Sequence, residues 1–350
     1  MRNGEVVIFT GSEISSLLAH RELEIIDLIQ KAYQTHEEGK STLPQSMFLR
    51  FPDNETNRII ALPAYLGGEF NLAGFKWIAS FPGNINQGID RASAITVLNS
   101  LQNGRPEFIF EGSILSAKRT AASAALAARL LCGRERAASF GLVGCGVINF
   151  EVLRFVRSVF THLERVLIYD LSSERAAQFQ WTCHETLGID VEIVPETRDL
   201  FRSCGLVSLA TTAIRPHLYD LKDCVPGFVI LHISLRDLAP SLVLRCQNIV
   251  DDMDHVCRAQ TSVHLAEQLV GHRNFITGTL ASLFHAEKQI LDLDSIKIFS
   301  PFGLGVLDLA LAGFVRDLGV ASGAGVTIPS FFPQSWSDSS QLHATRSMSA

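Results

Sequence analysis

A short apolar run that ends in closely spaced glycines constrains the fold more than any other feature of the sequence. The run Ser139–Val143 leads into Gly144 and Gly146, and a second apolar run ends in Asp170 about one βαβ unit later. A tight glycine turn lets backbone N–H groups approach a pyrophosphate at the start of the following helix. A carboxylate at the end of the second strand can accept hydrogen bonds from an adenosine ribose and repel a 2′-phosphate. The pattern predicts a Rossmann unit that binds NAD(H).

The glycine fingerprint is incomplete, because Asn149 stands where a third glycine is typical. The context supports the nucleotide-binding reading, since a strand precedes the glycines, a helix-like stretch covers residues 150–160, and the next strand ends in an acid. A βαβ turn with a purely structural role is the alternative.

Composition and charge narrow the class of protein. The 350 residues are enough for two domains or one large α/β domain, and 47% of them are hydrophobic. A net charge of −6 without a dense Lys/Arg block argues against a nucleic-acid partner, and no secretory signal or membrane-spanning apolar run stands out. Seven cysteines without a C-x-x-C pair suit reduced thiols, and no two histidines lie three or four residues apart. We expect a cytoplasmic protein without a metal site or a membrane partner.

The chain divides into three parts. Residues 1–125 combine one early helix, 14–38, with short strands separated by turns, which suggests an antiparallel or mixed sheet. Residues 126–304 alternate strands and helices, which predicts a parallel, doubly wound sheet. An apolar helix, 306–318, packs most economically back onto the first part, so that 1–125 and 305–330 form one discontinuous domain. The Ser-rich stretch 331–350 is expected to be disordered.

The predicted fold class is therefore α/β, with a Rossmann sheet and a discontinuous α+β domain. The predicted strands are 46–50, 58–63, 74–80, 94–99 and 107–111 in the first part, and 139–143, 166–170, 191–194, 206–210, 228–233 and 248–251 in the second.

Three basic residues stand in apolar or small-residue surroundings. Lys76 lies in a strand with apolar neighbours on both sides, where it either points into a site or snorkels to solvent. Arg119 opens an alanine-rich helix, where a guanidinium can clamp a carboxylate in a bidentate way or lie on the surface. Arg50 ends a strand and taken alone could equally be a surface residue.

Asp237 follows the apolar strand 228–233, so it is expected at the carboxyl edge of the sheet, where open α/β sheets bind ligands. A carboxylate there can exchange protons with a substrate or an attacking water. The alternatives are a helix N-cap or a loop aspartate, and Arg236 beside it could form a structural ion pair.

In this order the residues resemble the ornithine cyclodeaminase/μ-crystallin family over roughly residues 5–328. The resemblance is carried by five motifs: Arg58-Ile59-Ile60-Ala61-Leu62-Pro63, Gly74-Phe75-Lys76-Trp77, Lys118-Arg119-Thr120-Ala121-Ala122, Gly144-Cys145-Gly146 and Ser300-Pro301-Phe302-Gly303-Leu304-Gly305. It implies a homodimer, with a substrate-binding and dimerisation domain built from both chain ends around the Rossmann domain.

The resemblance also implies roles for individual residues. Arg50, Lys76 and Arg119 would hold the substrate carboxylate, and Asp237, together with Lys76, would be catalytic, with Asp237 as the acid/base residue. The residues implied around NAD are Thr120, Gly144, Cys145, Gly146, Val147, Ile148, Asp170, Thr211, Ser234 and Gly303.

One segment departs from the pattern of the cyclodeaminases. Those proteins carry a glycine pair before the aspartate, followed by proline and lysine, whereas Leu235 and Arg236 precede Asp237 here. This difference argues against ornithine cyclisation. With residues 75–80 and 90–93, it makes the chain similar to the branch that forms 2,3-diaminopropionate for siderophores or non-ribosomal peptides.

That branch implies N-(2-amino-2-carboxyethyl)-L-glutamate as the substrate, oxidised by NAD⁺ and hydrolysed to L-2,3-diaminopropionate and 2-oxoglutarate. Other functions stay open: an ornithine- or lysine-type cyclodeaminase, an amino-acid dehydrogenase or ketimine reductase, and a catalytically silent nucleotide-binding protein.

Overall fold

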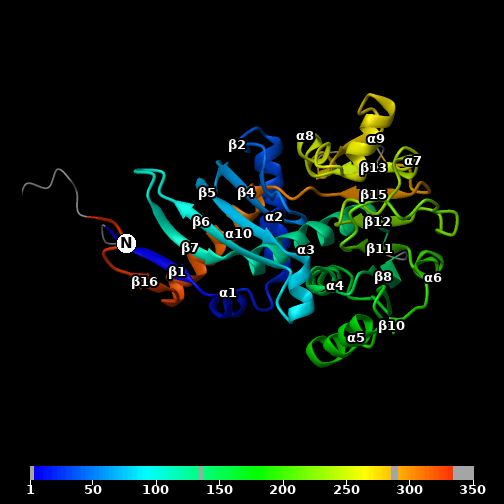
Figure 1. The fold of residues 1–350 in the computed structure, drawn as a ribbon, viewed down its shortest axis with the longest axis horizontal. Helices are drawn as coiled ribbons and strands as arrows, with labels where there is room; N and C mark the ends of the chain where they lie inside the picture. The colour runs from blue at the N-terminus through cyan, green and yellow to red at the C-terminus, as the bar shows by residue number, and fades with distance from the viewer. Residues whose placement is uncertain (1–3, 134–136, 285–290, 334–350) are drawn as a thin grey trace, which may run out of the picture.

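Two β-sheets, joined by the central helix α3 (Gly112–Leu131), organise the protein (Figure 1). The computed structural model describes residues 4–133, 137–284 and 291–333. The predicted disordered tail 331–350 lies outside these residues from position 334 onward. Within the described ranges, no helix has the length and apolar character needed to cross a membrane.

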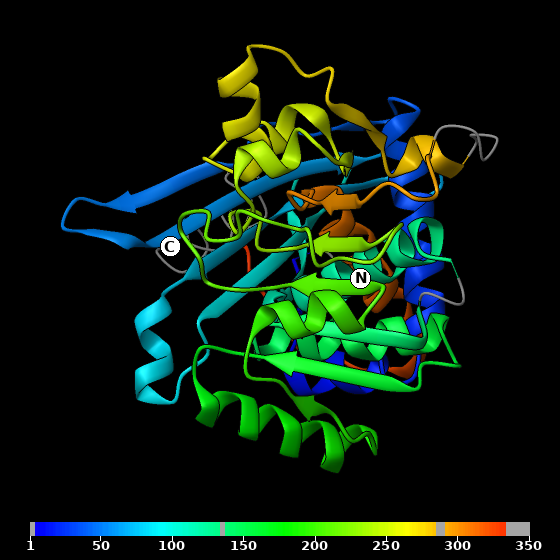
Figure 2. The same cartoon turned by 90° about the vertical axis from the view of Figure 1, so that its right-hand side faces the viewer.

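Sheet A contains the strands from the two ends of the chain. Its strands run in the order β16-β1-β7-β6-β5-β4-β2, with β3 paired to β4, and all pairs are antiparallel except β1 with β7. The bounds are β1 Val6–Phe9, β2 Ser41–Thr42, β3 Met47–Phe51, β4 Asn54–Leu66, β5 Leu72–Ser80, β6 Ala92–Asn99, β7 Pro106–Glu111 and β16 Val326–Ile328. The hairpin of β3 and β4, blue in Figure 2, projects beyond the Rossmann strands.

Within the described residues, helices pack on one face of sheet A and none packs on the other, which we call the open face. Helix α10 (Gly305–Ser322) lies against β4, β5 and β6, and α2 (Glu22–Glu37) and α3 pack beside it. Because neighbouring residues of a strand point to opposite faces, Lys76 of β5 points toward these helices and Trp77 points away. This alternation places a lysine inside the molecule and a tryptophan on its surface.

Local sequence accounts for the helix that joins the two sheets. The carboxylate of Glu111 caps α3 by accepting hydrogen bonds from the backbone N–H groups of Ser113 and Ile114, at 2.8 and 3.0 Å. Alanine has the highest helix propensity, and its small side chain lets α3 pack closely on both sheets. One hydrophobic cluster therefore extends from Phe9 in sheet A through Ala124 of α3 to Phe299 in sheet B.

Sheet B is the predicted doubly wound sheet. All of its strands are parallel, in the order β10-β9-β8-β11-β12-β15-β13-β14. The bounds are β8 Ser139–Val143, β9 Arg165–Tyr169, β10 Glu192–Ile193, β11 Leu206–Leu209, β12 Val229–His232, β13 Gln247–Val250, β14 Ile276–Thr279 and β15 Lys297–Ser300. After β8 the chain adds β9 and then β10 on one side of β8, and it then returns to place β11 on the other side of β8. The ligand-binding switch point of such a sheet thus lies between β8 and β11.

Shorter elements complete the described structure. They are α1 Gly11–Leu17, α4 Val147–Val159, α5 Ser173–Leu187, α6 Thr197–Ser203, α7 Pro240–Val243, α8 Met253–Val256, α9 Ser262–Val270 and the 3₁₀ helices η1 Pro82–Gln87 and η3 Ala281–Phe284. A second hydrophobic cluster, which includes Phe201 of α6 and Leu242 of α7, covers the face of sheet B opposite α4.

The predicted α/β class with a parallel sheet is confirmed, but several boundaries were wrong. The single helix expected over 14–38 is two helices, α1 and α2, because His20 adopts a left-handed conformation (φ 59°) that ends a helix. Strands β1, β2, β14, β15 and β16 were not predicted, since runs of two to four residues carry little periodicity. Helix α3 runs unbroken across position 125, where we expected a domain boundary. The division into domains stays a prediction.

Candidate active site

The glycine turn after β8 has the geometry that the sequence predicted. Gly144 has φ +94°, and a Cβ atom there would lie 2.5 Å from the carbonyl oxygen of Ala210 at the end of β11, so only glycine fits. Gly146 is the N-cap of α4 and makes no side-chain cap hydrogen bond. Val147 in the first turn is 62% exposed. The N-terminal N–H groups of α4 are therefore available to an anion at the switch point.

Asn149, which occupies the place of the third glycine, has a structural function. Its buried Nδ2 donates hydrogen bonds to the carbonyl oxygens of Val143 and Gly144, at 2.9 and 2.7 Å. Its Oδ1 accepts a hydrogen bond from Ser208 Oγ of β11 at 2.7 Å. The side chain ties α4 to both strands at the switch point, so the missing glycine does not weaken the turn.

Asp170 directly follows β9 and faces the glycine turn. Its carboxylate accepts hydrogen bonds from the backbone N–H groups of Cys145 and Ser172, at 2.8 and 2.9 Å. Burial, with a further contribution from Asp170, raises the pKa of the Cys145 thiol to about 12, so this thiol is neutral. The turn, the open helix end and the carboxylate fit a dinucleotide.

Lys76 and Arg119 meet at a buried carboxylate from the other end of the chain. Lys76 Nζ lies 2.7 Å from Asp308 Oδ2, and Arg119 Nε lies 3.1 Å from Asp308 Oδ1. Ser116 Oγ accepts hydrogen bonds from both cations, at 3.1 and 3.3 Å. Lys76 is 2% and Arg119 8% exposed, so neither is the surface residue that the alternative reading allowed. We call Lys76, Arg119 and Asp308 the cation cluster.

The cation cluster carries one net positive charge. Burial, and then the nearby Arg119, lower the pKa of Lys76 to about 8, although Asp308 opposes the shift. Two buried cations share one carboxylate, which leaves a charge that a substrate carboxylate could neutralise. The structure thus brings both predicted cations together around one buried carboxylate.

The loop between β15 and α10 closes over Arg119. Gly303 has φ +94°, and a Cβ atom there would lie 2.8 Å from Arg119 Nη1. The buried carboxylate of Asp251 accepts hydrogen bonds from the N–H groups of Gly303 and Phe302, at 2.7 and 2.9 Å. Asp251 therefore fixes this loop at the cation cluster.

Asp237 lies in the loop after β12 and is fully buried. Thr211 Oγ1 donates a 2.5 Å hydrogen bond to its Oδ1, and Ser234 Oγ donates one to its Oδ2. Burial alone would raise the pKa of Asp237, but the side chains of His232, Ser234 and Thr211 outweigh it and lower the pKa to about 2. Asp237 is therefore a buried, ionised loop carboxylate; it is not a helix N-cap, because Ala239 caps α7.

The other predicted residues lie in different parts of the structure. Thr211 and Ser234, expected at the cofactor, use their hydroxyls to hold Asp237. Thr120 is half-buried beside Arg119 on α3. Arg50 is exposed on β3, with its guanidinium 5.6 Å from the ring of Phe48, and it makes no hydrogen bond to the cation cluster. The structure brings Lys76 and Arg119 together and leaves Arg50 apart.

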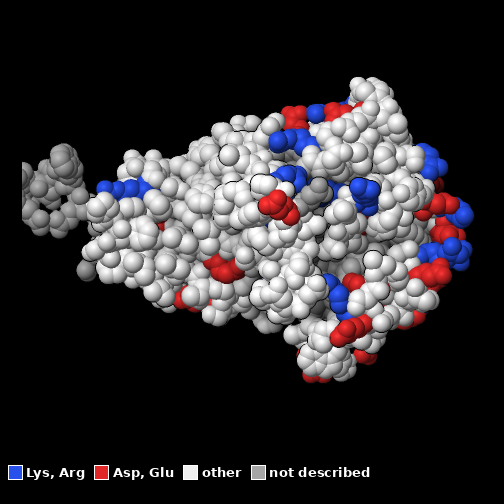
Figure 3. All heavy atoms as spheres, viewed as in Figure 1, with Lys and Arg blue, Asp and Glu red and all other residues white. Residues whose placement is uncertain are grey.

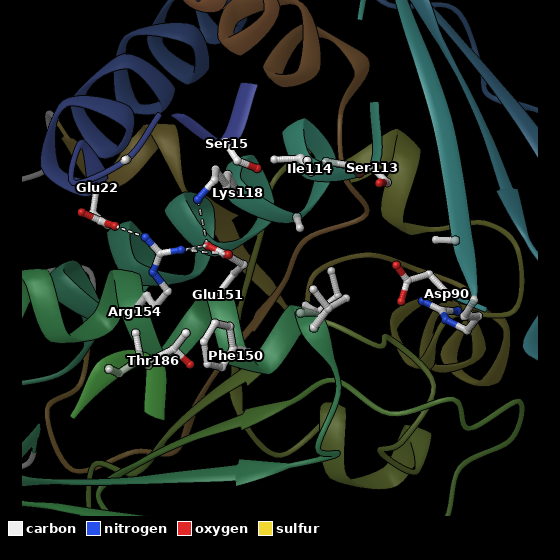
Figure 4. A pocket seen from close by; sticks show the side chains of 18 of the residues that line it. Ser15, Glu22, Asp90, Ser113, Ile114, Lys118, Phe150, Glu151, Arg154 and Thr186 are labelled. Carbon is white, nitrogen blue, oxygen red and sulfur yellow. Dashed lines mark hydrogen bonds and ion pairs between the residues drawn. The ribbon is translucent and has the colours of Figure 1, made fainter. Parts of the chain in front are cut away.

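A cavity of about 760 Å³ lies between the first turns of α3 and of α4 (Figure 4), and neither the cation cluster itself nor Asp237 lines it. Its lining includes Ser116, which accepts hydrogen bonds from Lys76 and Arg119. It also includes Val147 and Ile148 at the start of α4 and Arg91 before β6. At one end a chain of ion pairs links Lys118, Glu151, Arg154 and Glu22, with distances of 3.3, 3.1 and 2.6 Å. Figure 4 shows Asp90 across the cavity from this chain.

Sequence reasoning missed Asp308, although the signal was present. Asp308 is the lone charge in the apolar run 304–315, which is the criterion that singled out Lys76. His232 was also missed: it is fully buried, and its Nε2 accepts a hydrogen bond from the backbone N–H of Asp237 at 3.2 Å. Nothing in the sequence indicates that contact.

Known proteins resemble the chain over nearly its whole length. It is 27% identical over 343 residues to the N-((2S)-2-amino-2-carboxyethyl)-L-glutamate dehydrogenase of Staphylococcus aureus, covering 93% of this chain and 99% of the relative. It is also 27% identical over 334 residues to the alanine dehydrogenase of Archaeoglobus fulgidus, with coverage of 93% and 99%.

Solved structures agree on the fold. An archaeal alanine dehydrogenase dimer with bound NAD superposes with a TM-score of 0.82 at 26% identity, covering 94% of this chain and all (100%) of that one. The Δ1-pyrroline-2-carboxylate reductase of Thermococcus litoralis, in complex with NADH and L-proline, gives a TM-score of 0.85 at 22% identity, covering 92% and 100%. The model of the ornithine cyclodeaminase/mu-crystallin family matches residues 5–322. The resemblance found in the sequence is thereby confirmed, and the protein belongs to the ornithine cyclodeaminase/mu-crystallin family.

Proposed function

We propose that the protein oxidises N-(2-amino-2-carboxyethyl)-L-glutamate with NAD⁺ and water, giving L-2,3-diaminopropionate, 2-oxoglutarate, NADH and a proton. The broader conclusion does not depend on this substrate: the chain is an NAD-dependent oxidoreductase that acts on an amino-acid-derived compound. The observation that carries the specific proposal is the buried cation cluster, together with an ionised Asp237 after β12, in a chain similar to the S. aureus dehydrogenase over 93% of its length. The product would serve a siderophore or non-ribosomal peptide pathway.

The cofactor-binding residues fit the proposal. Gly144, Cys145, Gly146, Val147 and Ile148 would present backbone N–H groups to the pyrophosphate, since α4 begins there without a side-chain cap. Asp170 would accept hydrogen bonds from the adenosine ribose. Thr120, Thr211, Ser234 and Gly303 would complete the binding site at the switch point. When bound, NAD⁺ supplies the hydride acceptor.

The basic residues would fix the substrate. Lys76 and Arg119 supply buried positive charge for one carboxylate, and Asp308 keeps both side chains oriented. Arg50 would reach the substrate from β3. A carboxylate held at two points fixes the Cα–H bond that must break, which is the positional part of catalysis.

Asp237 would accept and donate protons at the reacting C–N bond. Because it is ionised at neutral pH, it starts the cycle as a base and can take a proton from the water that attacks the imine carbon. It then returns that proton to the departing amine. Its negative charge also stabilises positive charge that develops on the nitrogen.

A second candidate is an amino-acid dehydrogenase or imine reductase acting on a simpler substrate. The A. fulgidus alanine dehydrogenase is as similar to the chain as the S. aureus enzyme, at 27% identity each. A catalytically silent binder fits less well, because Lys76, Arg119 and Asp237 are all present and all buried.

We also propose that the protein is a homodimer that associates through the open face of sheet A. Met47, Trp77 and Ile95 lie in one cross-strand row on this face and are 69%, 39% and 44% exposed. Figure 3 shows few charged side chains over sheet A, whereas charges gather over the Rossmann strands. An exposed apolar row on a sheet is typical of an interface.

Purified protein incubated with NAD⁺ and single substrates tests the function. We expect net NADH with N-(2-amino-2-carboxyethyl)-L-glutamate and little with alanine, proline or ornithine. Ammonia and proline released from ornithine without net NADH would instead assign cyclodeamination. NADH formed from alanine alone would assign the second candidate.

A further inference from the structure

Four arginines gather where the end of β5 meets the loop after β12. Arg50 and Arg58 lie directly opposite each other on β3 and β4, and Ser80 lies opposite Arg58 on β5. Arg91 Nη1 donates a 3.3 Å hydrogen bond to Ser80 Oγ. We call Arg50, Arg58, Arg91 and Arg236 the arginine group.

Arg236 joins the group from the Rossmann side. After burial, the charges of Arg236, Arg91 and Arg50 are what lower the pKa of Arg58 to about 10. Burial followed by the charge of Arg50 lowers the pKa of Arg236 as well. The four cations therefore repel one another across the gap between the two sheets.

The group has no ion-paired carboxylate in the described parts of the chain, although the charge of Asp237 partly offsets the lowering of the pKa of Arg236. None of the four forms an ion pair there, and the buried Nε of Arg58 has no hydrogen-bond partner. Holding like charges together opposes folding, and three of the four, Arg58, Arg91 and Arg236, are half-buried. Such an arrangement is favourable once an anion binds between the charges.

The position of the group relates it to the cation cluster. Arg58 and Ser80 share a sheet face with Lys76, and Ser80 lies four residues beyond Lys76, about 13 Å along the strand. Arg91 lines the same cavity as Ser116, whose hydroxyl bonds to Lys76. Arginine side chains reaching back from this row can shorten the gap to the span of a small extended substrate.

The backbone before Arg236 is strained. Leu235 has φ 67°, a left-handed conformation that a bulky side chain rarely adopts. The N–H of Ser262 holds it by donating a 2.7 Å hydrogen bond to the Leu235 carbonyl oxygen. Strain of this kind concentrates at ligand clamps, where the surrounding structure maintains it.

We propose that the arginine group is a second anion subsite, which binds the side-chain carboxylate of the glutamyl half while the cation cluster holds its α-carboxylate. Arg58 and Arg236 then determine specificity, because a substrate with a single carboxylate leaves their charges unneutralised. This inference rests on the proposed function for the identity of the substrate. The product 2-oxoglutarate carries the same two carboxylates and serves as a probe.

Calorimetric titration of the full-length protein, saturated with NADH, tests the subsite directly. We expect 2-oxoglutarate to bind about 10- to 100-fold more tightly than 2-oxopentanoate, which lacks the second carboxylate. Arg58→Leu and Arg236→Leu should remove most of this preference and leave 2-oxopentanoate binding unchanged. Arg58→Lys should restore part of it, and Arg198→Leu, which alters an exposed ion pair with Glu196, should change nothing.

The melting temperature serves as the control for folding. Removing one of several repelling charges should leave the melting temperature equal or higher, so lost binding would not reflect unfolding. Equal affinity of the wild type for both keto acids would overturn the proposal. So would variants that weaken NADH binding and spare 2-oxoglutarate, since the arginines would then serve the cofactor phosphates.

The same titration distinguishes this inference from the proposed function. If the wild type fails to oxidise N-(2-amino-2-carboxyethyl)-L-glutamate but prefers 2-oxoglutarate, the function is wrong and the subsite stands. If it oxidises that compound without any preference between the two keto acids, the function stands and the subsite is wrong.

Discussion

The protonation states of Lys76 and Asp237 depend on the side chains next to them. The pKa of Lys76 is lowered because it is buried beside Arg119, and the pKa of Asp237 is lowered because His232 lies next to it and Ser234 and Thr211 donate hydrogen bonds to it. At neutral pH Lys76 is a cation that lies next to another cation, Arg119, and Asp237 is an anion that is buried away from solvent. These two states allow the site to hold a carboxylate and to accept a proton.

The pKa of Lys76 predicts how binding depends on pH. With a pKa of about 8, the free protein loses the Lys76 charge above that pH, so kcat/KM should fall as the pH rises through 8. Initial rates between pH 6 and 10 at saturating NAD⁺ measure this. Lys76→Arg, which stays charged, should shift the fall to higher pH; an unmoved profile would assign the titration to the substrate amine.

The same shift has a consequence for stability. An unfolded lysine titrates near 10.5, so unfolding takes up a proton between about pH 8 and pH 10.5. This group therefore adds stability as the pH rises through that range and opposes folding below it.

Replacing Asp237 tests its proton role. Asp237→Asn keeps the size of the side chain and removes its charge, so turnover should fall by about 10²- to 10⁴-fold. NAD⁺ affinity, measured by fluorescence titration, should be nearly unchanged, because the asparagine amide oxygen can still accept a hydrogen bond from Thr211 or Ser234 and keep it in place. Asp223→Asn, at an exposed pair with Arg202, is the matched control. Unaltered turnover in Asp237→Asn would remove this residue from the mechanism.

At the scale of elements, helix α4 is attached to the sheet by one side chain. Asn149 makes three hydrogen bonds to β8, the glycine turn and β11, where the common fingerprint has a glycine. A residue that looks like a departure in the sequence is thus part of the structure of the turn.

Restoring the fingerprint should therefore harm the protein. Asn149→Gly completes the glycine pattern but loses those hydrogen bonds, and we expect a loss of about 2–4 kcal/mol in the free energy of unfolding. Asn149→Ala loses the same bonds and should be about 1 kcal/mol less harmful, since glycine weakens a helix. Urea denaturation measures both. A variant Asn149→Gly as stable as the wild type would contradict this account.

The elements also show what could be read from the sequence and what could not. The glycine turn, Asp170, Lys76, Arg119 and Asp237 were predictable, because each interrupts a clear local pattern. Asp308 showed the same signal and was overlooked, although its partner Lys76, 232 residues away, could not be named from the sequence. His232 was not predictable, because nothing in the sequence shows that its ring accepts the N–H of Asp237. Short strands such as β10 and β14 are set by pairing with neighbours, which leaves little trace in their own sequence.

At the scale of the whole molecule, the two chain ends build one site. Strands β1 and β16 pair at the edge of sheet A, and α10 carries Asp308 to the cation cluster. The helix-covered face of sheet A thus carries Lys76 and the proposed substrate site, and its other face carries the proposed dimer interface.

A charged side chain introduced on the open face of sheet A should prevent two protomers from associating. Trp77→Lys places a cation in the apolar row of Met47, Trp77 and Ile95, so the protein should shift from dimer to monomer. Light scattering after size exclusion measures the mass. Tyr219→Lys, on an exposed tyrosine outside sheet A, should leave the dimer intact. A wild type that runs as a monomer at micromolar concentration would refute the interface.

The stoichiometry of the reaction tests the central claim most directly. Purified protein, excess NAD⁺ and a limiting amount of N-(2-amino-2-carboxyethyl)-L-glutamate should yield NADH, 2-oxoglutarate and L-2,3-diaminopropionate in equal amounts, followed by absorbance and mass spectrometry. No NADH and unchanged substrate, from protein that binds NAD⁺, would contradict the account.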